Sequence, residues 1–387
     1  VPMISNNCSI MSWNVRGINA PAKRSAICEV ATTLKTAILT LQETKVEVWT
    51  TGIAKEIGGP MLQGCAVLAA MGTRGGAAIF WNKEIVEVES HSIGRFTITA
   101  KVKELGTNIQ FWLTTVYGPN DDGIREDFLQ EMSSCAPPLG QAWPITGDFN
   151  MIYEARDKNN QHLNRRFMGR FRRALDFAGL REIKCKNRRF TWSNERENPT
   201  LCSIDKFFCT ISWASMFPSY MLHAASTSFS DHCPLILSRA DCQPRKARFR
   251  FENFWPQHPH YSETVQHAWE RPVNHDCPFV RIKIKMQRVA MDLKIWSRSL
   301  FSKTKLQFHI ANEVILQLDI AQEKRALTAE GFNLRKLLKT KVLGLAAIER
   351  ARERQASRVT WLRAGTLAQK IFMLNAMQEE GRTTFIG

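Results

Sequence analysis

The sequence lacks the marks of membrane and secreted proteins. No apolar run approaches the roughly 18 residues that a membrane-spanning helix needs, and runs such as "AILTL" and "LGLAAI" have only the length of core segments. The N-terminus shows neither a basic stretch nor an apolar one, so no signal peptide is expected. These absences predict an intracellular protein of the nucleus or cytoplasm, not secreted and with no membrane partner.

Paired cysteines are also missing. The ten cysteines are scattered over the 387 residues, without a CxxC pair or the spacing of a zinc site. Thiols distributed in this way fit a reducing compartment, where disulfides rarely persist. The sequence therefore predicts neither structural zinc nor disulfide bonds.

Acidic residues are few compared with basic ones. The formal net charge is +17, and residues 241–387 carry 26 Lys and Arg against 14 Asp and Glu, whereas the first 240 residues carry 27 against 22. Such a surplus favours polyanionic partners, among them nucleic acids. A solvated basic helical surface would give the same count, so the charge alone leaves both interpretations open.

Residues 1–240 alternate short β-rich runs with Gly, Pro and Asn turns. Strands are expected at 10–13, 38–41, 77–81, 96–102, 109–116, 143–146, 190–192, 204–208 and 235–237. Helices are expected at 22–34 and 168–177. On the second helix, Phe171, Leu175 and Phe177 are expected to face the protein core. Many short strands with a few helices predict an α/β sandwich.

The pattern changes after residue 240. Residues 279–354 contain no proline and few glycines, and apolar residues recur at helical spacing at Leu334, Leu338, Val342, Leu345 and Ile348. This predicts a long basic helical region, either a hairpin or a helix for a partner, that is too irregular for a coiled coil. The chain is therefore predicted to hold one domain over 1–240 and a helical extension over 241–387.

Three polar, acidic islands each follow an apolar run: "LQETK" at 41–45, "GDFN" at 147–150 and "SDH" at 230–232. Asn14 follows the run at 10–13 in the same way. Asn14 and Glu43 together offer one neutral and one anionic oxygen, a sparse set that suits Mg²⁺, which keeps several waters. Taken singly, Asn14 would be a turn former and Glu43 a surface residue.

The other two islands carry groups for acid–base chemistry. Asp148 and Asn150 are two apart, so at an extended strand end they would point to one side, with Asp148 activating water and Asn150 donating to a phosphate. Asp231 precedes His232, and Asp205 in "SIDK" is placed to accept from the second ring nitrogen, which would raise the pKa of the imidazole. A single histidine of this kind is otherwise more often a core residue.

Tyr117 in "TTVYGPN" would bring its hydroxyl to a phosphate oxygen, or else pack ahead of a Gly-Pro turn. Carboxylates, amides and one imidazole gathered at strand ends are the groups that a metal-dependent phosphodiester hydrolase requires. A metal neutralises a phosphate oxygen, a carboxylate activates water and a cationic histidine meets the charge that builds on the phosphate. The first hypothesis is a nuclease.

Seven motifs in order strengthen that hypothesis: "MSWNVRGIN", "LQETK", "TRGGAAIFW", "WLTTVYGPN", "GDFNMI", "RRFTWSNERENPTLCSIDKFF" and "SDHCPLIL". Over residues 8–240 the sequence resembles the endonuclease domain of plant LINE-type (non-LTR) retrotransposon polyproteins, within the endonuclease/exonuclease/phosphatase superfamily. The resemblance implies a DNase I-like four-layer α/β/β/α sandwich, Mg²⁺ as cofactor with Mn²⁺ as a substitute, and nicking of DNA that leaves a 3′-hydroxyl.

The resemblance also implies roles for ten side chains. Asn14 and Glu43 would hold the metal, and Thr191 and Ser230 would bind substrate. Catalysis would fall to Asp148, Asn150, His232, Asp205, Tyr117 and Asp231, with Asp205 orienting His232. Lys206 departs from the family pattern, which has Arg after the "ID", and loses the bidentate guanidinium fork.

The segments "FRFENFW" and "SRVTWLRAGTLAQKIF" resemble the region that joins the endonuclease to a reverse transcriptase. No YxDD-type polymerase motif occurs, so copying of RNA is not expected. The basic extension is a candidate for binding DNA or the RNA of the element. Two alternatives stay open: a catalytically inactive nucleic-acid-binding remnant, and an abasic-site repair endonuclease or phosphatase on the same fold.

Overall fold

The computed structural model describes residues 8–72, 75–226, 228–239, 255–257, 260–300 and 303–363. The chain divides into two compact units, Val1–Gln243 with Phe308–Ala347, and Pro244–Gln307 with Ile348–Gly387. In the second unit, α6 (Tyr261–Glu270) packs along α7 (Pro278–Leu300). Among the described helices, none has the length and apolar character to cross a membrane.

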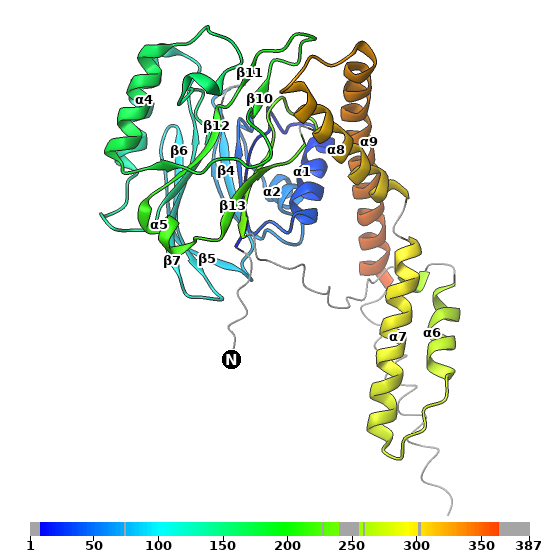
Figure 1. The fold of residues 1–387 in the computed structure, drawn as a ribbon. Coiled ribbons are helices and arrows are strands. Elements are labelled where there is room, and N and C mark those ends of the chain that lie inside the picture. The colour runs from blue at the N-terminus through cyan, green and yellow to red at the C-terminus, as the bar shows by residue number, and fades with distance from the viewer. Residues whose placement is uncertain are drawn as a thin grey trace, which may run out of the picture. The chain divides into compact units, whose positions relative to one another are not determined.

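Two six-stranded sheets form the centre of the first unit (Figure 1). The first sheet runs β13 (Tyr220–Ala224), β14 (Leu235–Arg239), β1 (Ile10–Asn14), β2 (Ile38–Gln42), β4 (Ala77–Trp81) and β3 (Gly64–Leu68). The second runs β5 (Val86–Ile93), β6 (Thr97–Glu104), β7 (Gln110–Tyr117), β8 (Pro144–Asp148), β12 (Asp205–Cys209) and β9 (Arg181–Glu182). A small ribbon pairs β10 (Trp192–Ser193) with β11 (Leu201–Cys202).

Alternation along the strands divides the apolar side chains between two faces. In β1, Ile10 belongs to the cluster between the sheets, whereas Met11 and Trp13 belong to the cluster on the outer face. Ser12 follows Ile10 on the inner face, and Gln42 of β2 donates both to Ser12 Oγ (3.2 Å) and across to Thr115 Oγ1 of the second sheet (2.8 Å). The space between the sheets is therefore apolar at one end and polar at the other.

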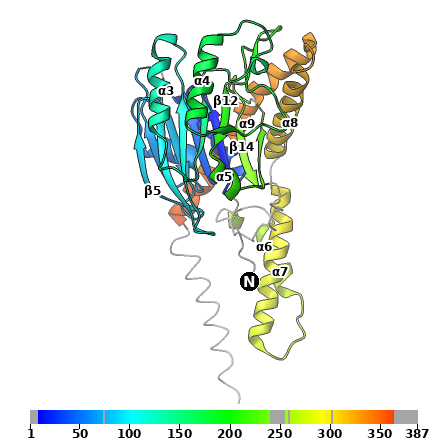
Figure 2. The same ribbon diagram turned by 60° about the vertical axis from the view of Figure 1, so that its left-hand side comes forward.

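Helices cover both outer faces. The first sheet is covered by α1 (Pro21–Thr33) and α2 (Thr51–Gly58), and the second by α3 (Arg125–Ser134) and α4 (Arg165–Phe177). A short helix, α5 (Ile211–Met216), follows β12. Figure 1 shows α4 on one side of the sheets and α1 on the other, and Figure 2 shows α3 and α4 together on one side. The predicted four-layer α/β/β/α sandwich with a helical C-terminal extension is confirmed.

Sequence patterns located most strands of the sheets but missed β3, β5, β9, β11 and β13, together with α2, α3 and α5. β5, "VEVESHSI", is an edge strand whose residues after Val86 are mostly exposed, so it lacks a clear apolar signal. The inward orientation predicted for Phe177 is wrong, because its side chain is 87% exposed while Phe171 and Leu175 are buried. Phe177 lies two residues after Leu175, which on a helix places it on the opposite face.

The extension contributes two helices, α8 (Lys303–Gln322) and α9 (Ala329–Arg363). Phe308 and Ile315 of α8 and Val342 of α9 are buried in the same cluster as Met11 and Trp13. The predicted apolar stripe is narrower than its spacing indicates, because Leu334 and Ile348 are 43% and 48% exposed. The domain boundary at residue 240 stays a prediction, and "FRFENFW" and "SRVTWLRAGTLAQKIF" fall largely outside the described residues.

Gly147 in β8 fixes how closely β7 and β8 approach. Its φ is 140°, and a Cβ added there would lie 2.0 Å from the Val116 carbonyl oxygen of β7. A side chain at this position would push the two parallel strands apart, next to Asp148.

We expect Gly147→Ala to lower the free energy of unfolding by at least about 2 kcal/mol, because it combines a backbone clash with an unfavourable φ. Urea unfolding measures this. Gly344→Ala in α9 is the matched control, since a Cβ there meets nothing within 4 Å and should be neutral or stabilising by up to about 1 kcal/mol. Equal midpoints for the two variants would contradict the close packing of β7 on β8.

Candidate active site

The candidate site lies at one edge of the sandwich, where central strands of both sheets end. Asn14 is the last residue of β1, and Tyr117 and Asp148 are the last residues of the parallel neighbours β7 and β8. Because β12 runs antiparallel to β8, its first residue, Asp205, pairs with Asp148. Glu43 directly follows β2, the parallel neighbour of β1. Topology alone thus brings side chains from distant parts of the sequence to one edge.

Asp148 is the centre of the cluster and is 1% exposed. Its Oδ2 accepts from Asn14 Nδ2 (2.8 Å), and its Oδ1 accepts from the backbone N–H of Asn150 (2.9 Å). Burial raises the pKa of the Asp148 carboxyl, and the neighbouring Asp205 raises it further, against the opposing effects of His232, Asn150 and Asn14. A carboxyl whose pKa is shifted toward neutrality is suited to exchange a proton.

His232 is held by Asp205, as the sequence predicted. Its Nδ1 lies 2.9 Å from Asp205 Oδ2 and 3.1 Å from Oδ1. Its Nε2 lies 4.0 Å from Asp148 Oδ2 and 3.9 Å from Asp231 Oδ1. Burial alone would lower the pKa of His232, but the charge and hydrogen bond of Asp205, with Asp148 behind it, give a net upward shift. The geometry thus favours an oriented, cationic imidazole.

Asn14 and Glu43 lie side by side at this edge, and their role as metal ligands stays a prediction. Asn14 Nδ2 donates to Glu43 Oε2 (3.2 Å) as well as to Asp148, while its Oδ1 accepts from the Arg16 backbone N–H (3.0 Å). Glu43 Oε1 pairs with Lys45 Nζ at 3.0 Å. The carboxylates of Glu43 and Asp148 both accept from Asn14 Nδ2. Two carboxylates this close together offer oxygen ligands to a hard divalent cation.

A second donor set overlaps the first. One ligand atom from each of Asp148, Asp205 and His232 lies within 4.8 Å of the others, so this buried trio could also hold a metal ion. Asp205, however, is already engaged by the His232 ring. A cation held by the trio would compete with the Asp205–His232 contact, whereas one held by Glu43 and Asp148 would leave that contact intact.

Tyr117 lies beside the same carboxylates. Burial raises the pKa of its hydroxyl, and the negative charges of Glu43 and Asp148 raise it further. The phenol is therefore a stable hydrogen-bond donor.

Asp231 lines a pocket next to the cluster. Its Oδ2 accepts from Trp192 Nε1 (3.0 Å) and pairs with the guanidinium of Arg16. The pocket has a volume of about 450 Å³ and is lined by Arg16, Lys23, Trp192, Asn194, Glu195, Phe229, Ser230 and Asp231. Sequence reasoning singled out neither Trp192 nor Arg16, although both lie inside quoted motifs. A basic and aromatic rim is compatible with a nucleic-acid strand.

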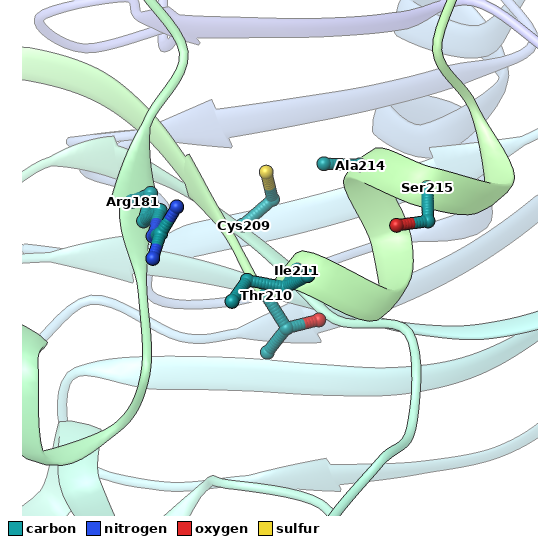
Figure 3. Close-up of a pocket in the computed structure, with 6 residues that line it drawn as sticks. All are labelled: Arg181, Cys209, Thr210, Ile211, Ala214 and Ser215. Atoms are coloured by element: carbon teal, nitrogen blue, oxygen red, sulfur yellow. The ribbon is translucent and has the colours of Figure 1, made fainter.

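Figure 3 shows a different pocket, of about 230 Å³, lined by Arg181, Cys209, Thr210, Ile211, Ala214 and Ser215. It lies at the end of β12 opposite to Asp205, since Cys209 is the last residue of that strand. It includes no residue of the carboxylate–histidine cluster and is not part of the candidate site.

Thr191 and Ser230, predicted to bind substrate, are buried and make contacts with the backbone of other site residues. Ser230 Oγ donates to the Asn14 carbonyl (2.7 Å) and accepts from the His232 N–H (3.1 Å). Thr191 Oγ1 accepts from the Asp205 N–H (3.1 Å). These contacts position Asn14, His232 and Asp205, and direct substrate binding by either hydroxyl stays a prediction.

Asn150 differs from its predicted geometry. The extended backbone that would align it with Asp148 is wrong, because Asn150 is left-handed with φ 48°, and its Nδ2 donates to the Gly118 carbonyl (2.7 Å). Arg16, Glu43 and Lys45 also have φ between 48° and 56°. Unfavourable backbone of this kind collects at functional sites, where the surrounding structure holds it in place.

Lys206 shows what the cation after Asp205 does. Its ammonium is buried between Glu182 Oε1 (2.6 Å) and Asp157 Oδ2 (3.2 Å). A compact ammonium suits two separate carboxylates, so Lys at this position is compatible with the fold.

Residues 11–232 match the sequence profile of the Endonuclease/Exonuclease/phosphatase family. Among solved structures, the AP endonuclease LMAP from Leishmania major aligns over 62% of this chain and 89% of its own, with 16% identity and a TM-score of 0.50. The endonuclease domain of TRAS1, a telomere-specific non-LTR retrotransposon, aligns over 60% and 98%, with 17% identity and a TM-score of 0.47. An AP endonuclease from Archaeoglobus fulgidus aligns over 60% and 99%, with 19% identity and a TM-score of 0.48.

The comparison with curated proteins returns no match. Identities this low indicate a shared fold only. The profile match, in contrast, spans more than half of the chain and every residue of the cluster from Asn14 to His232. The chain therefore belongs to the Endonuclease/Exonuclease/phosphatase family and has its DNase I-like fold.

Proposed function

We propose that the chain is a divalent-metal-dependent phosphodiester hydrolase that nicks DNA, an endonuclease of the non-LTR retrotransposon type. The observation that carries the proposal is the convergence of Asp148, the Asp205–His232 pair and the Asn14–Glu43 pair in one buried cluster. A structural cluster would not need two carboxylates to share one amide beside an imidazole, because burying like charges together is costly.

Each side chain has a defined task in this mechanism. Asp148, whose pKa is raised, takes a proton from the attacking water, and Asn150 holds the turn beyond it. Asp205 keeps His232 protonated and oriented, so that the imidazolium meets the charge that builds on the phosphate. Tyr117, kept protonated, donates to a phosphate oxygen. Attack of water breaks the bond between phosphorus and the 3′ oxygen, which takes up a proton from solvent, so the nick leaves a 3′-hydroxyl and a 5′-phosphate.

Asn14 and Glu43 would hold the metal, with Mg²⁺ as the cofactor and Mn²⁺ as a substitute. A bound divalent ion neutralises a phosphate oxygen and so lowers the barrier to attack. Arg16 and Lys23 line the neighbouring pocket and place positive charge where the DNA backbone would run. The basic helical extension is proposed to add to DNA binding and to contact the RNA of the element.

His232→Ala should lower the rate of supercoiled-plasmid nicking by at least about 100-fold, because it removes the cation that stabilises the transition state. Nicking is measured with Mg²⁺ on the full chain. His223→Ala, which changes a half-buried histidine of β13, is the matched control and should nick at the wild-type rate. A wild-type rate for His232→Ala would overturn the site assignment.

Glu43→Ala should also reduce nicking by at least about 100-fold at fixed Mg²⁺, and partial recovery at high Mg²⁺ would reflect weakened metal binding. Glu47→Ala removes an exposed carboxylate four residues away and serves as the control. EDTA should abolish nicking by the wild type. Activity that persists in EDTA would contradict metal dependence.

The two alternatives give different results in the same assays. An inactive nucleic-acid binder would shift DNA on a gel without nicking it, with or without Mg²⁺. A repair enzyme would cut a duplex that carries one abasic site far faster than the intact duplex, whereas the proposed endonuclease should cut both at similar rates.

A further inference from the structure

The helices α8 and α9 contact the loop that carries Asp231 and His232. Lys339 Nζ of α9 donates to the Ser230 carbonyl (2.8 Å), and Ser226 Oγ donates to Asn312 Oδ1 of α8 (2.6 Å). Phe229 packs against the apolar cluster that includes Phe308 and Val342. The loop is therefore fixed from both helices by polar and apolar contacts.

A second segment of the site is fixed by the same helices. The buried Asp319 of α8 accepts from Arg188 (3.1 Å) and from Arg335 of α9 (2.7 Å). Glu323 accepts from the backbone N–H groups of Arg189 (3.0 Å) and Phe190 (3.1 Å). These contacts end one residue before Thr191, whose hydroxyl holds the backbone of Asp205.

Lys339 lies where the two segments meet. Besides the Ser230 carbonyl, its ammonium pairs with Glu195, which also accepts from Arg335 (3.3 Å). Ser230 in turn donates to the Asn14 carbonyl and accepts from the His232 N–H. Ser230 thus connects the ammonium of Lys339 to the backbone of Asn14, a proposed metal ligand, and to the backbone of His232.

The family match ends at residue 232, about 100 residues before this lysine. The contact of Lys339 with the Ser230 carbonyl therefore comes from a residue outside the part of the chain that matches the family. In this chain, a segment beyond the nuclease domain reaches back to its catalytic loop.

We propose that Lys339 is a positioning residue of the active site, and that α8 and the first half of α9 hold the loop 228–232 in its catalytic geometry. The proposal rests on the proposed function for its kinetic consequence, but the loop contact itself does not depend on it. A loop displaced by about 1 Å would cost roughly 100-fold in rate, because catalysis depends on the alignment of reacting groups.

Lys339→Met in the full chain should lower kcat for plasmid nicking by about 10- to 100-fold, with KM for DNA and the unfolding midpoint close to wild type. Lys341→Met is the matched control, since it removes an exposed lysine from the same helix and the same net charge. Lys339→Arg should recover most of kcat, because a guanidinium can reach both acceptors. A kcat for Lys339→Met equal to that of Lys341→Met would overturn the proposal, as would a loss confined to KM.

Two further measurements keep the test decisive. Hydrogen exchange at the His232 amide should accelerate in Lys339→Met and not in Lys341→Met, even if the wild type proves unable to nick DNA. Failure of the proposed function would therefore be distinguishable from failure of the loop contact. If Lys339→Met does not fold, Ser226→Ala removes the contact with Asn312 and should reduce kcat several-fold. An unchanged kcat there would overturn the proposal.

Discussion

The hydrogen bond from Asn14 to Asp148 is the contact on which the site depends, because it joins the last residues of two strands that belong to different sheets. The two sheets meet through an apolar interior, which fixes their separation but not the chemistry at its edge. At that edge one amide lies between the carboxylates of Glu43 and Asp148. Every other group of the cluster is arranged around these two acids.

The negative charges of the cluster are partly offset by nearby positive groups. Three carboxylates, Glu43, Asp148 and Asp205, lie near one imidazole and one amide. Asp205 contacts the His232 ring, and its negative charge shifts the pKa of that histidine upward. Lys45 and Arg16 compensate from the rim. Such an arrangement tolerates an added divalent cation better than the loss of the histidine, because a cation relieves the same repulsion.

The site residues could be predicted from the sequence because strand ends carry them. Asn14, Glu43, Asp148 and His232 each follow an apolar run, and parallel neighbours must end at one edge. The conformation of Asn150 could not be predicted, since a left-handed φ leaves no mark in a strand pattern. The burial of Arg188 and Arg335 against Asp319 could not be predicted either, because charged residues of a loop or of a basic helix are expected to face solvent.

The outer face of the first sheet has a practical consequence for where the molecule can be cut. Met11 and Trp13 share one apolar cluster with side chains of α8 and α9, two helices that lie far beyond the end of the family match. A shortened chain that stops near residue 240 would expose the part of this apolar cluster that α8 and α9 contact, and the exposed apolar surface would promote self-association. Laboratory expression of the nuclease region should accordingly retain the sequence through residue 347, the end of the compact unit.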